Sequence, residues 1–365
     1  MKPLSNHLEI WGFEQNAAIF ADGSLGLALN LAPVDPACWE DERANEFSNR
    51  VGQFLNSLPS GISVQFVQDI VPGNKGAIDR HVGLSSESKN ALATTLCQER
   101  ANRLQKQDDL GLLPAFSLKL FVRKPPTKGL VDRPKIFSKE RLFEPVAEDR
   151  LKIELQDLYR LRDRLGQELL SLGIATTQLS TDEMAELLYK QWNPARKQPL
   201  ASYDPDDIRN TVLFSDVGIS HEGFCIGKRH FRLLSLKVLP DATHSTMAAA
   251  LCDLPFQSRL FLTVFVPDQL KEIEKLKTQR RIAYSMTVGK KSVSDIESNA
   301  KLQDLESLLE EMIADGEKVF DAALNVVLQS DDLDSLEAQV DQVLAKFREL
   351  GGAEGMQETI AAYDI

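Results

Sequence analysis

The sequence predicts an α+β fold made of two tandem ferredoxin-like units, each a split βαβ arrangement with a helical insertion between its second and third strands. The first observation is an order of elements that occurs twice: strand, helix, strand, long helical segment, strand and helix, from about Leu25 and again from His230. The second is that both first helices end in Leu-Pro and both last helices end in Leu-Gly. A coincidental repeat is the alternative, because α+β proteins often contain strand, helix, strand by chance.

The first unit is expected over residues 1–180 and opens with a hairpin. Two apolar runs flank Asp22-Gly23, and this dipeptide favours a tight turn because glycine accepts the positive φ that the turn requires. The insertion is expected to be loop-like at 71–83 and helical at 85–109. The other predicted elements are strands at 25–31, 61–71 and 115–123, and helices at 42–59 and 151–173.

Residues 181–210 are predicted to form a helical and proline-rich linker. Thr181-Asp182-Glu183 can begin a short helix that ends near Trp192, and repeated X-Pro steps then break the chain. This stretch is the predicted domain boundary.

The second unit is expected over residues 211–365, with a helical-hairpin insertion at 268–315. Apolar residues from Leu302 to Ile313 recur at steps of three and four, which is typical of an amphipathic helix, and the hairpin tip is predicted at VGKKSVSD. Gly351-Gly352 is expected to end the last helix through a left-handed residue. The other predicted elements are strands at 230–239, 258–266 and 318–329, and helices at 244–255 and 333–351.

Composition excludes several classes of function. A net charge of −12 and a pI of about 5.1 disfavour general binding to nucleic acid, whose phosphates attract Lys and Arg. No apolar run approaches the roughly 20 residues that span a bilayer, so a soluble protein is expected. The four cysteines show no framework spacing, which favours free thiols in a reducing cytoplasm.

Catalytic and cofactor motifs are not found in the sequence. A Walker A loop needs a glycine five residues before its Gly-Lys, and Gly227-Lys228 and Gly289-Lys290 both lack it. Ser24 lies in a sequence resembling a nucleophile elbow, but Asp22 replaces the first glycine. The five histidines have no metal-ligand spacing. No catalytic, cofactor-binding or metal-binding residue is therefore predicted.

The second insertion carries a local excess of basic residues. Between residues 268 and 301, eight basic residues stand against five acidic ones, so this arm is predicted to contact an acidic partner or anionic lipid. A solvated helix face is the alternative, since mixed Lys and Glu is common on exposed helices. The candidate contact residues are Lys275, Lys277, Arg280, Arg281, Lys290 and Lys291.

Several segments together resemble the N-terminal half of the TraC/TrbE/CagE-type ATPases of type IV secretion and conjugation systems. They are DGSLGLALNLAPVD, LNSLPSGISVQF, FVRKPP, LCDLPFQSRLFLTVFV and, most extensively, KVFDAALNVVLQSDDLDSLEAQVDQVLAKFRELGGAEG. The resemblance spans nearly the whole chain and rests on patterns of apolar residues, Gly and Pro rather than on catalytic groups.

This resemblance implies a docking and oligomerisation domain that supports pilus assembly and macromolecule transfer. It implies a cytoplasmic location, peripheral at the inner membrane, with other type IV secretion subunits and copies of itself as partners and a hexamer as the expected assembly. ATP and Mg are implied only for a motor domain C-terminal to residue 365, and no ATPase residue carries over to this chain.

Two rival functions remain open at the level of sequence. An enzyme with an unrecognised active site between the two units predicts a polar cleft with perturbed pKa values. A tandem RNA-binding protein would also use ferredoxin-like sheets, but AFSLKLFV lacks the glycine and the basic start of an RNP1 strand. Direct binding of nucleic acid is therefore not expected.

Overall fold

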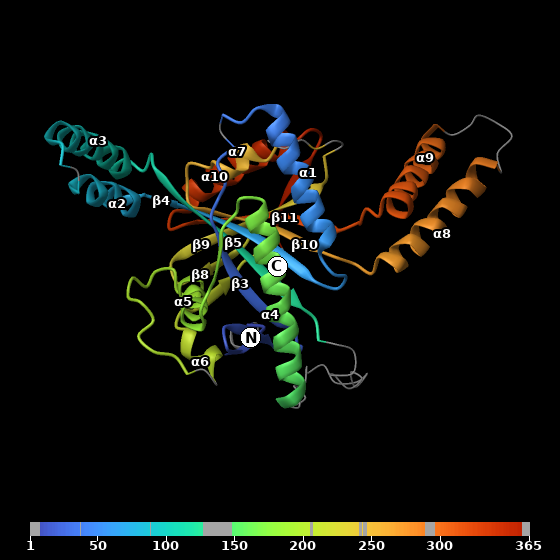
Figure 1. The fold of residues 1–365 in the computed structure, drawn as a ribbon, viewed down its shortest axis with the longest axis horizontal. Coiled ribbons are helices and arrows are strands. Elements are labelled where there is room, and N and C mark those ends of the chain that lie inside the picture. Colours follow the sequence, from blue (N-terminus) through green and yellow to red (C-terminus); the bar gives the residue numbers. More distant parts are fainter. Residues whose placement is uncertain are drawn as a thin grey trace.

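A single antiparallel sheet organises the chain (Figure 1). The computed structural model describes residues 8–36, 38–87, 89–126, 148–204, 207–240, 243, 247–288 and 296–359. Within these residues, twelve strands form the sheet in the order β1-β2-β3-β5-β4-β10-β11-β9-β8-β7, while β6 pairs with β3 and β12 pairs with β9. The strands are β1 (Ile10–Glu14), β2 (Ala17–Phe20), β3 (Leu25–Leu31), β4 (Ser63–Pro72), β5 (Pro114–Lys124), β6 (Thr176–Gln178), β7 (Val217–Ile219), β8 (Phe224–Ile226), β9 (Arg229–Val238), β10 (Ser258–Phe265), β11 (Asp321–Ser330) and β12 (Glu354–Glu358).

The two halves of the sheet repeat one strand order. In the first half the order is β6-β3-β5-β4, and in the second it is β12-β9-β11-β10, with all neighbours antiparallel. The halves join where β4 pairs with β10, in a register that places Val67 opposite Phe261. The strands β4 and β10 occupy corresponding positions in the two halves, and their pairing makes the sheet continuous across the junction.

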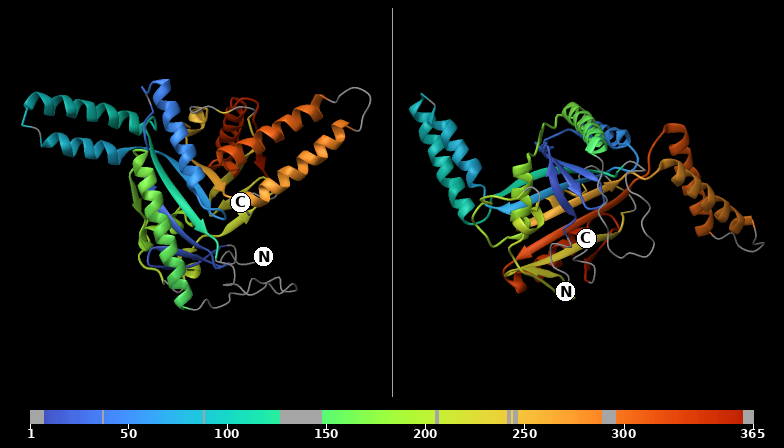
Figure 2. Two further views of the ribbon diagram at one scale, coloured as in Figure 1. Left: turned by 45° about the vertical axis from the view of Figure 1, so that its right-hand side comes forward. Right: turned by 90° about the horizontal axis from the view of Figure 1, so that it is seen from below.

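Helices cover one face of this sheet (Figures 1 and 2). On that face α1 and α4 pack on the first half, and α7 and α10 pack on the second half. The helices are α1 (Asp41–Ser57), α2 (Lys75–Ser86), α3 (Ala91–Asp109), α4 (Glu148–Ser171), α5 (Thr181–Trp192), α6 (Ile208–Val212), α7 (Ala249–Cys252), α8 (Gln269–Val288), α9 (Ile296–Glu310) and α10 (Leu333–Arg348), with a π-helical turn at Glu311–Asp315.

The period-two alternation of a strand explains which residues form the cores. On β4, Val64 and Ile70 point to the helices, whereas Gln65 and Asp69 point to the opposite face. The core under α1 and α4 includes Val264 of the second half, and the core under α7 and α10 includes Ile70 of the first. Each half therefore completes its core with residues of the other.

A helical hairpin projects from each half of the sheet, between β4 and β5 in the first half and between β10 and β11 in the second. The hairpin α2–α3 follows β4, and the hairpin α8–α9 follows β10. Because β4 and β10 are antiparallel neighbours, the two hairpins leave the sheet at opposite ends (Figures 1 and 2). We refer to α2–α3 as the first arm and to α8–α9 as the second arm.

A smaller cluster packs on the face of the sheet opposite the four helices. There α5 and α6 contact β1, β2 and Ala28 of β3. Asn193, which follows α5, is fully buried; its amide nitrogen donates to the backbone oxygens of Tyr189 and Val212, and its oxygen accepts from Phe214 N and Ser215 Oγ. The stretch predicted as a linker thus packs closely against the first half of the sheet.

Several sequence predictions are confirmed. The hairpin around Gly23 pairs β2 with β3, and Gly23 has a φ of 79°. The helix beginning at Thr181 ends at Trp192, and Gly351 and Gly352 both have positive φ. The mixed α+β class is also as predicted.

Other predictions are wrong. Most of 71–83 is not a loop, because β4 extends to Pro72 and α2 begins at Lys75. The predicted helix 244–255 is reduced to the four residues of α7 within the described part, and residues 244–246 lie outside it. Ile313 of the predicted apolar stripe is 60% exposed. The short strands β6 and β12 escaped prediction because each carries mostly polar or small residues.

Candidate functional site

The lysines predicted to contact a partner lie on α8 of the second arm. Lys275 pairs with Glu272 at 3.2 Å, and Lys277 pairs with Glu274 at 3.6 Å. These are exposed i,i+3 pairs on one helix, so their charges are partly neutralised by neighbours. They offer a partner less net charge than the sequence count suggests.

Arg280 and Arg281 differ from these lysines. Both are exposed in the C-terminal half of α8, and among the residues that the structure describes neither has an ion-pair partner. They are the predicted contact residues that remain available for an anionic partner. Lys290, Lys291 and most of the predicted hairpin tip lie outside the described residues.

Charge on the second arm is separated between its two helices. The α8 segment carries five basic and two acidic residues, whereas α9 carries one basic and four acidic residues. The predicted excess of positive charge therefore belongs to α8, and the arm presents one basic and one acidic helix. The acidic residues of α9 beyond Lys301 lie outside residues 268–301, for which the excess of basic residues was predicted.

Both arms expose large apolar side chains. Leu270 at the start of α8 is 76% exposed, and Leu110 at the end of α3 is 74% exposed. Contiguous exposed apolar patches mark surfaces for contact with other proteins, and these residues are the candidates for such a patch on the arms. The other exposed apolar residues of the two arms and their bases are Leu84, Leu92, Leu96 and Leu112 on the first, and Ile282, Tyr284 and Ile313 on the second.

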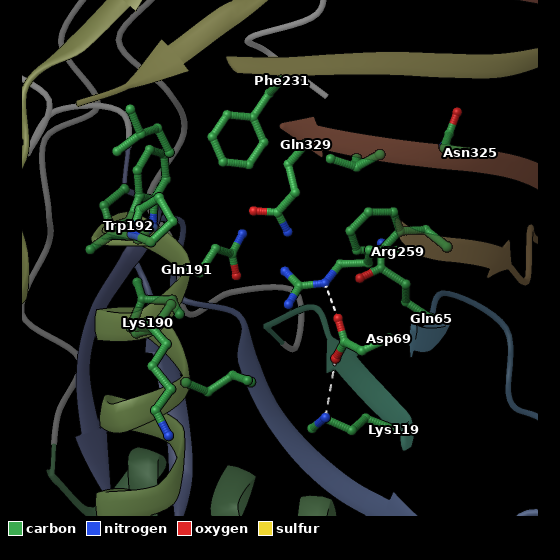
Figure 3. A pocket seen from close by; sticks show the side chains of 18 of the residues that line it. Gln65, Asp69, Lys119, Lys190, Gln191, Trp192, Phe231, Arg259, Asn325 and Gln329 are labelled. Carbon is green, nitrogen blue, oxygen red and sulfur yellow. Dashed lines mark hydrogen bonds and ion pairs between the residues drawn. The ribbon is translucent and has the colours of Figure 1, made fainter. Parts of the chain in front are cut away.

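A cleft of about 1990 Å³ lies on the sheet face that the four helices leave uncovered (Figure 3). Its floor is formed by β4, β5, β9, β10 and β11, and α5 with β1 forms a wall. We call it the central cleft, since the β4–β10 junction runs through its floor. The sequence prediction missed it because the cleft is assembled from strands that are distant in the chain.

A charged cluster occupies the floor of the central cleft at the junction of the halves. Asp69 of β4 accepts from Lys119 Nζ on β5 at 3.2 Å and from Arg259 Nε on β10 (Figure 3). Asp69 and Arg259 are opposite each other in the strand register. Lys119 also donates to Ser117 Oγ at 2.9 Å. Two cations share one carboxylate, which leaves this part of the floor with positive charge.

A second arginine in the central cleft is fully engaged. Arg229 forms a two-pronged pair with Asp331, with both N–O distances 3.0 Å, and donates from its third nitrogen to Gln257. The hydrogen bond from Arg229, together with its charge, holds the pKa of Asp331 below its ordinary value. The donors of Arg229 are therefore taken up by contacts within the protein, whereas Arg259 keeps unused donors.

Ser24 has a structural role. It is buried, donates from Oγ to Asp22 at 2.6 Å and accepts from Arg123 Nε at 2.8 Å. Arg123 also lies over the ring of Phe20. These contacts tie the hairpin turn to β5, and the hydroxyl is committed to them.

Neither a metal centre nor a membrane span is found in the described part of the chain. No group of three or more His, Cys, Asp or Glu side chains there could hold a metal ion. None of the described helices combines the length and the apolar character needed to cross a bilayer.

The fold and these surfaces define a mixed α+β protein with a continuous antiparallel sheet, two projecting helical arms and an open cleft. A family model described as TraC protein matches residues 4–352, which is nearly the whole chain. The chain therefore belongs to the TraC family of type IV secretion and conjugative transfer. A search of curated proteins found no match.

Proposed function

We propose that this chain is the docking and oligomerisation domain of a type IV secretion ATPase, and that it works in pilus assembly and macromolecule transfer at the cytoplasmic face of the inner membrane. Family membership supports a component of a type IV secretion system that acts with other subunits. The observation that favours docking is the pair of arms, which carry exposed apolar residues away from the sheet.

The repeated strand order supports a tandem origin for the scaffold. We infer that each half is a ferredoxin-like unit, because both have the order fourth, first, third, second strand with antiparallel neighbours. The proposed units keep the predicted bounds, 1–180 and 211–365, with 181–210 between them. Arms that leave opposite ends of one rigid sheet can contact two different neighbours, which suits a subunit of a larger assembly.

Charge reversal on α8 tests the docking role. The double variant Arg280→Glu and Arg281→Glu should fold normally, since exposed substitutions usually change stability by less than about 0.5 kcal/mol. In cells that make the other secretion subunits, we expect less of this variant in the membrane fraction after flotation. The matched control is Arg160→Glu with Arg348→Glu, which makes the same charge change on α4 and α10. Equal membrane recovery of both variants and the wild type would exclude docking through α8.

The proposal assigns no nucleotide chemistry to this chain. ATP and Mg are proposed to belong to a motor domain that would follow residue 365. Calorimetric titration of the chain with Mg-ATP should give no saturable heat, because its sequence lacks the glycine-rich motif whose loop presents several N–H groups to a triphosphate. Saturable micromolar binding would contradict this assignment.

A further inference from the structure

Arg259 has unused hydrogen-bond donors in the central cleft. Its Nε donates to Asp69, and within the described residues neither Nη group has an acceptor. Figure 3 shows these two nitrogens directed away from Asp69 into the cleft. A guanidinium has five N–H donors in a planar fork that matches a carboxylate, so most of its binding capacity remains available. The side chain is only 23% exposed, so an anion reaching it would be shielded from water.

Asp69 does not cancel the charge of this group. It is shared between Arg259 and Lys119, and both its oxygens are used. The cluster therefore keeps one positive charge beyond what Asp69 neutralises. An incoming carboxylate would be the second negative charge beside the two positive charges of Arg259 and Lys119.

The surroundings of Arg259 suit a polypeptide. Gln191 of α5 and Asn325 and Gln329 of β11 line the cleft, and among the described residues their amide groups have no partner. Side-chain amides both donate and accept, as a peptide main chain does. Between them lie the apolar side chains of Phe261 and Val327, which would cover the side chains of a bound segment.

Size and charge argue against other occupants. The volume of about 1990 Å³ is roughly twice the upper end of ordinary small-molecule pockets, which run to about 1,000 Å³. The carboxylates of Glu9, Glu183 and Glu186 also line the cleft, and Glu9 and Glu186 use the charges of Arg123 and Lys190, so the cleft is not the continuous basic surface that the closely spaced phosphates of a nucleic acid require. A polypeptide with an isolated acidic side chain meets both conditions.

We propose that the central cleft binds a polypeptide segment of a partner protein and that an acidic side chain of this segment pairs with the Nη groups of Arg259. This inference rests on the proposed docking function and adds the chemistry of the partner. It gives the open sheet face a role separate from that of the arms.

Selection of short random peptides displayed on phage, using the whole chain as the target, tests this proposal. We expect recovered peptides to be enriched in Asp or Glu, and their affinity to fall by at least about tenfold on Arg259→Gln. The variant should keep its melting temperature, because Asp69 remains paired with Lys119. Arg259→Lys keeps the charge but not the fork, so it should give an intermediate affinity.

Arg280→Gln is the matched control, since it removes the same charge from α8 outside the cleft. It should leave the affinity of the recovered peptides unchanged. Failure to recover any peptide whose binding depends on Arg259 overturns the proposal. Binding of a single-stranded oligothymidine that depends on Arg259 also overturns it and assigns the cleft to nucleic acid.

The two proposals can fail separately. Peptide binding that ignores Arg259, beside loss of membrane recovery for the α8 variant, removes the cleft inference and leaves docking intact. If peptide binding depends on Arg259 while the α8 variant is recovered with the membrane as well as the wild type, docking takes place through the cleft and not through α8.

Discussion

Gln65 of β4 donates from Nε2 to Thr263 Oγ1 of β10 at 2.9 Å, across the line where the two halves of the sheet meet. This hydrogen bond and the Asp69–Arg259 ion pair link β4 to β10 through side chains, in addition to the backbone pairing of the two strands. The halves also share core residues, since Ile70 packs under α7 and α10. The protein is therefore expected to unfold as one unit despite its internal repeat.

Substitution of Ile70 tests this coupling. Ile70→Ala should lower the free energy of unfolding by about 2–5 kcal/mol, because Ile70 is 1% exposed and its removal leaves a cavity between the halves. Urea denaturation followed by circular dichroism measures the change. Leu270→Ala on the second arm is the control and should change stability by less than about 0.5 kcal/mol. Two separate unfolding transitions in the wild type would contradict the coupling.

Two glycines should respond in opposite directions to alanine. A Cβ on Gly355 would lie 2.2 Å from Phe347 Cδ2, and Phe347 is fully buried. Gly355→Ala should therefore cost about 1–3 kcal/mol through overpacking between β12 and α10. Gly52 lies inside α1 with nothing within 4 Å of its would-be Cβ, so Gly52→Ala should stabilise by about 0.5–1 kcal/mol. Thermal unfolding compares the two; a stabilising Gly355→Ala would refute the close packing of β12.

Sequence patterns predicted the long elements and missed what the assembled sheet creates. The strands β3, β4, β10 and β11 carry strong apolar patterns, and the turn at Gly23 has a distinct local signal. The central cleft could not be predicted, because Asp69 and Arg259 are 190 positions apart and meet only when β4 pairs with β10. A polar residue within an apolar strand, such as Asp69, was the one local signal of that site.

Asn193 is a second residue whose structural role could not be predicted from the sequence. In the sequence it is a residue before proline, which indicates a break, whereas in the structure it joins α5, α6 and the chain leading to β7. Asn193→Ala should lower the free energy of unfolding by at least about 2 kcal/mol, since its buried partners lose their hydrogen bonds. Asn193→Asp should be worse, because it loses the donors and buries a charge. Chemical denaturation of both variants measures the change in the free energy of unfolding. An Asn193→Asp variant as stable as the wild type would contradict this role.

Asp22 supplies a prediction about pH. Burial raises its pKa, but hydrogen bonds from Ser24 and the charge and hydrogen bond of Arg123 outweigh burial, so the pKa of Asp22 lies below its ordinary value. A carboxyl whose pKa is lowered by folding stabilises the protein above its unfolded pKa of about 3.9, and this stabilisation is lost as pH falls through the folded value. Asp22→Asn should therefore be less stable than the wild type at pH 7, and the difference should shrink as the pH falls below about 4.

The size of this effect at Asp22 is limited by solvent. Its side chain is 42% exposed, so the difference at pH 7 is expected to stay below about 1 kcal/mol. Urea unfolding of the wild type and Asp22→Asn at several pH values between neutral and acidic gives the difference directly. Arg123→Gln should also be less stable than the wild type at pH 7, because it breaks the ion pair with Asp22 together with the one to Glu9. A difference that stays constant or grows as the pH falls would show that the carboxylate charge does not stabilise this turn.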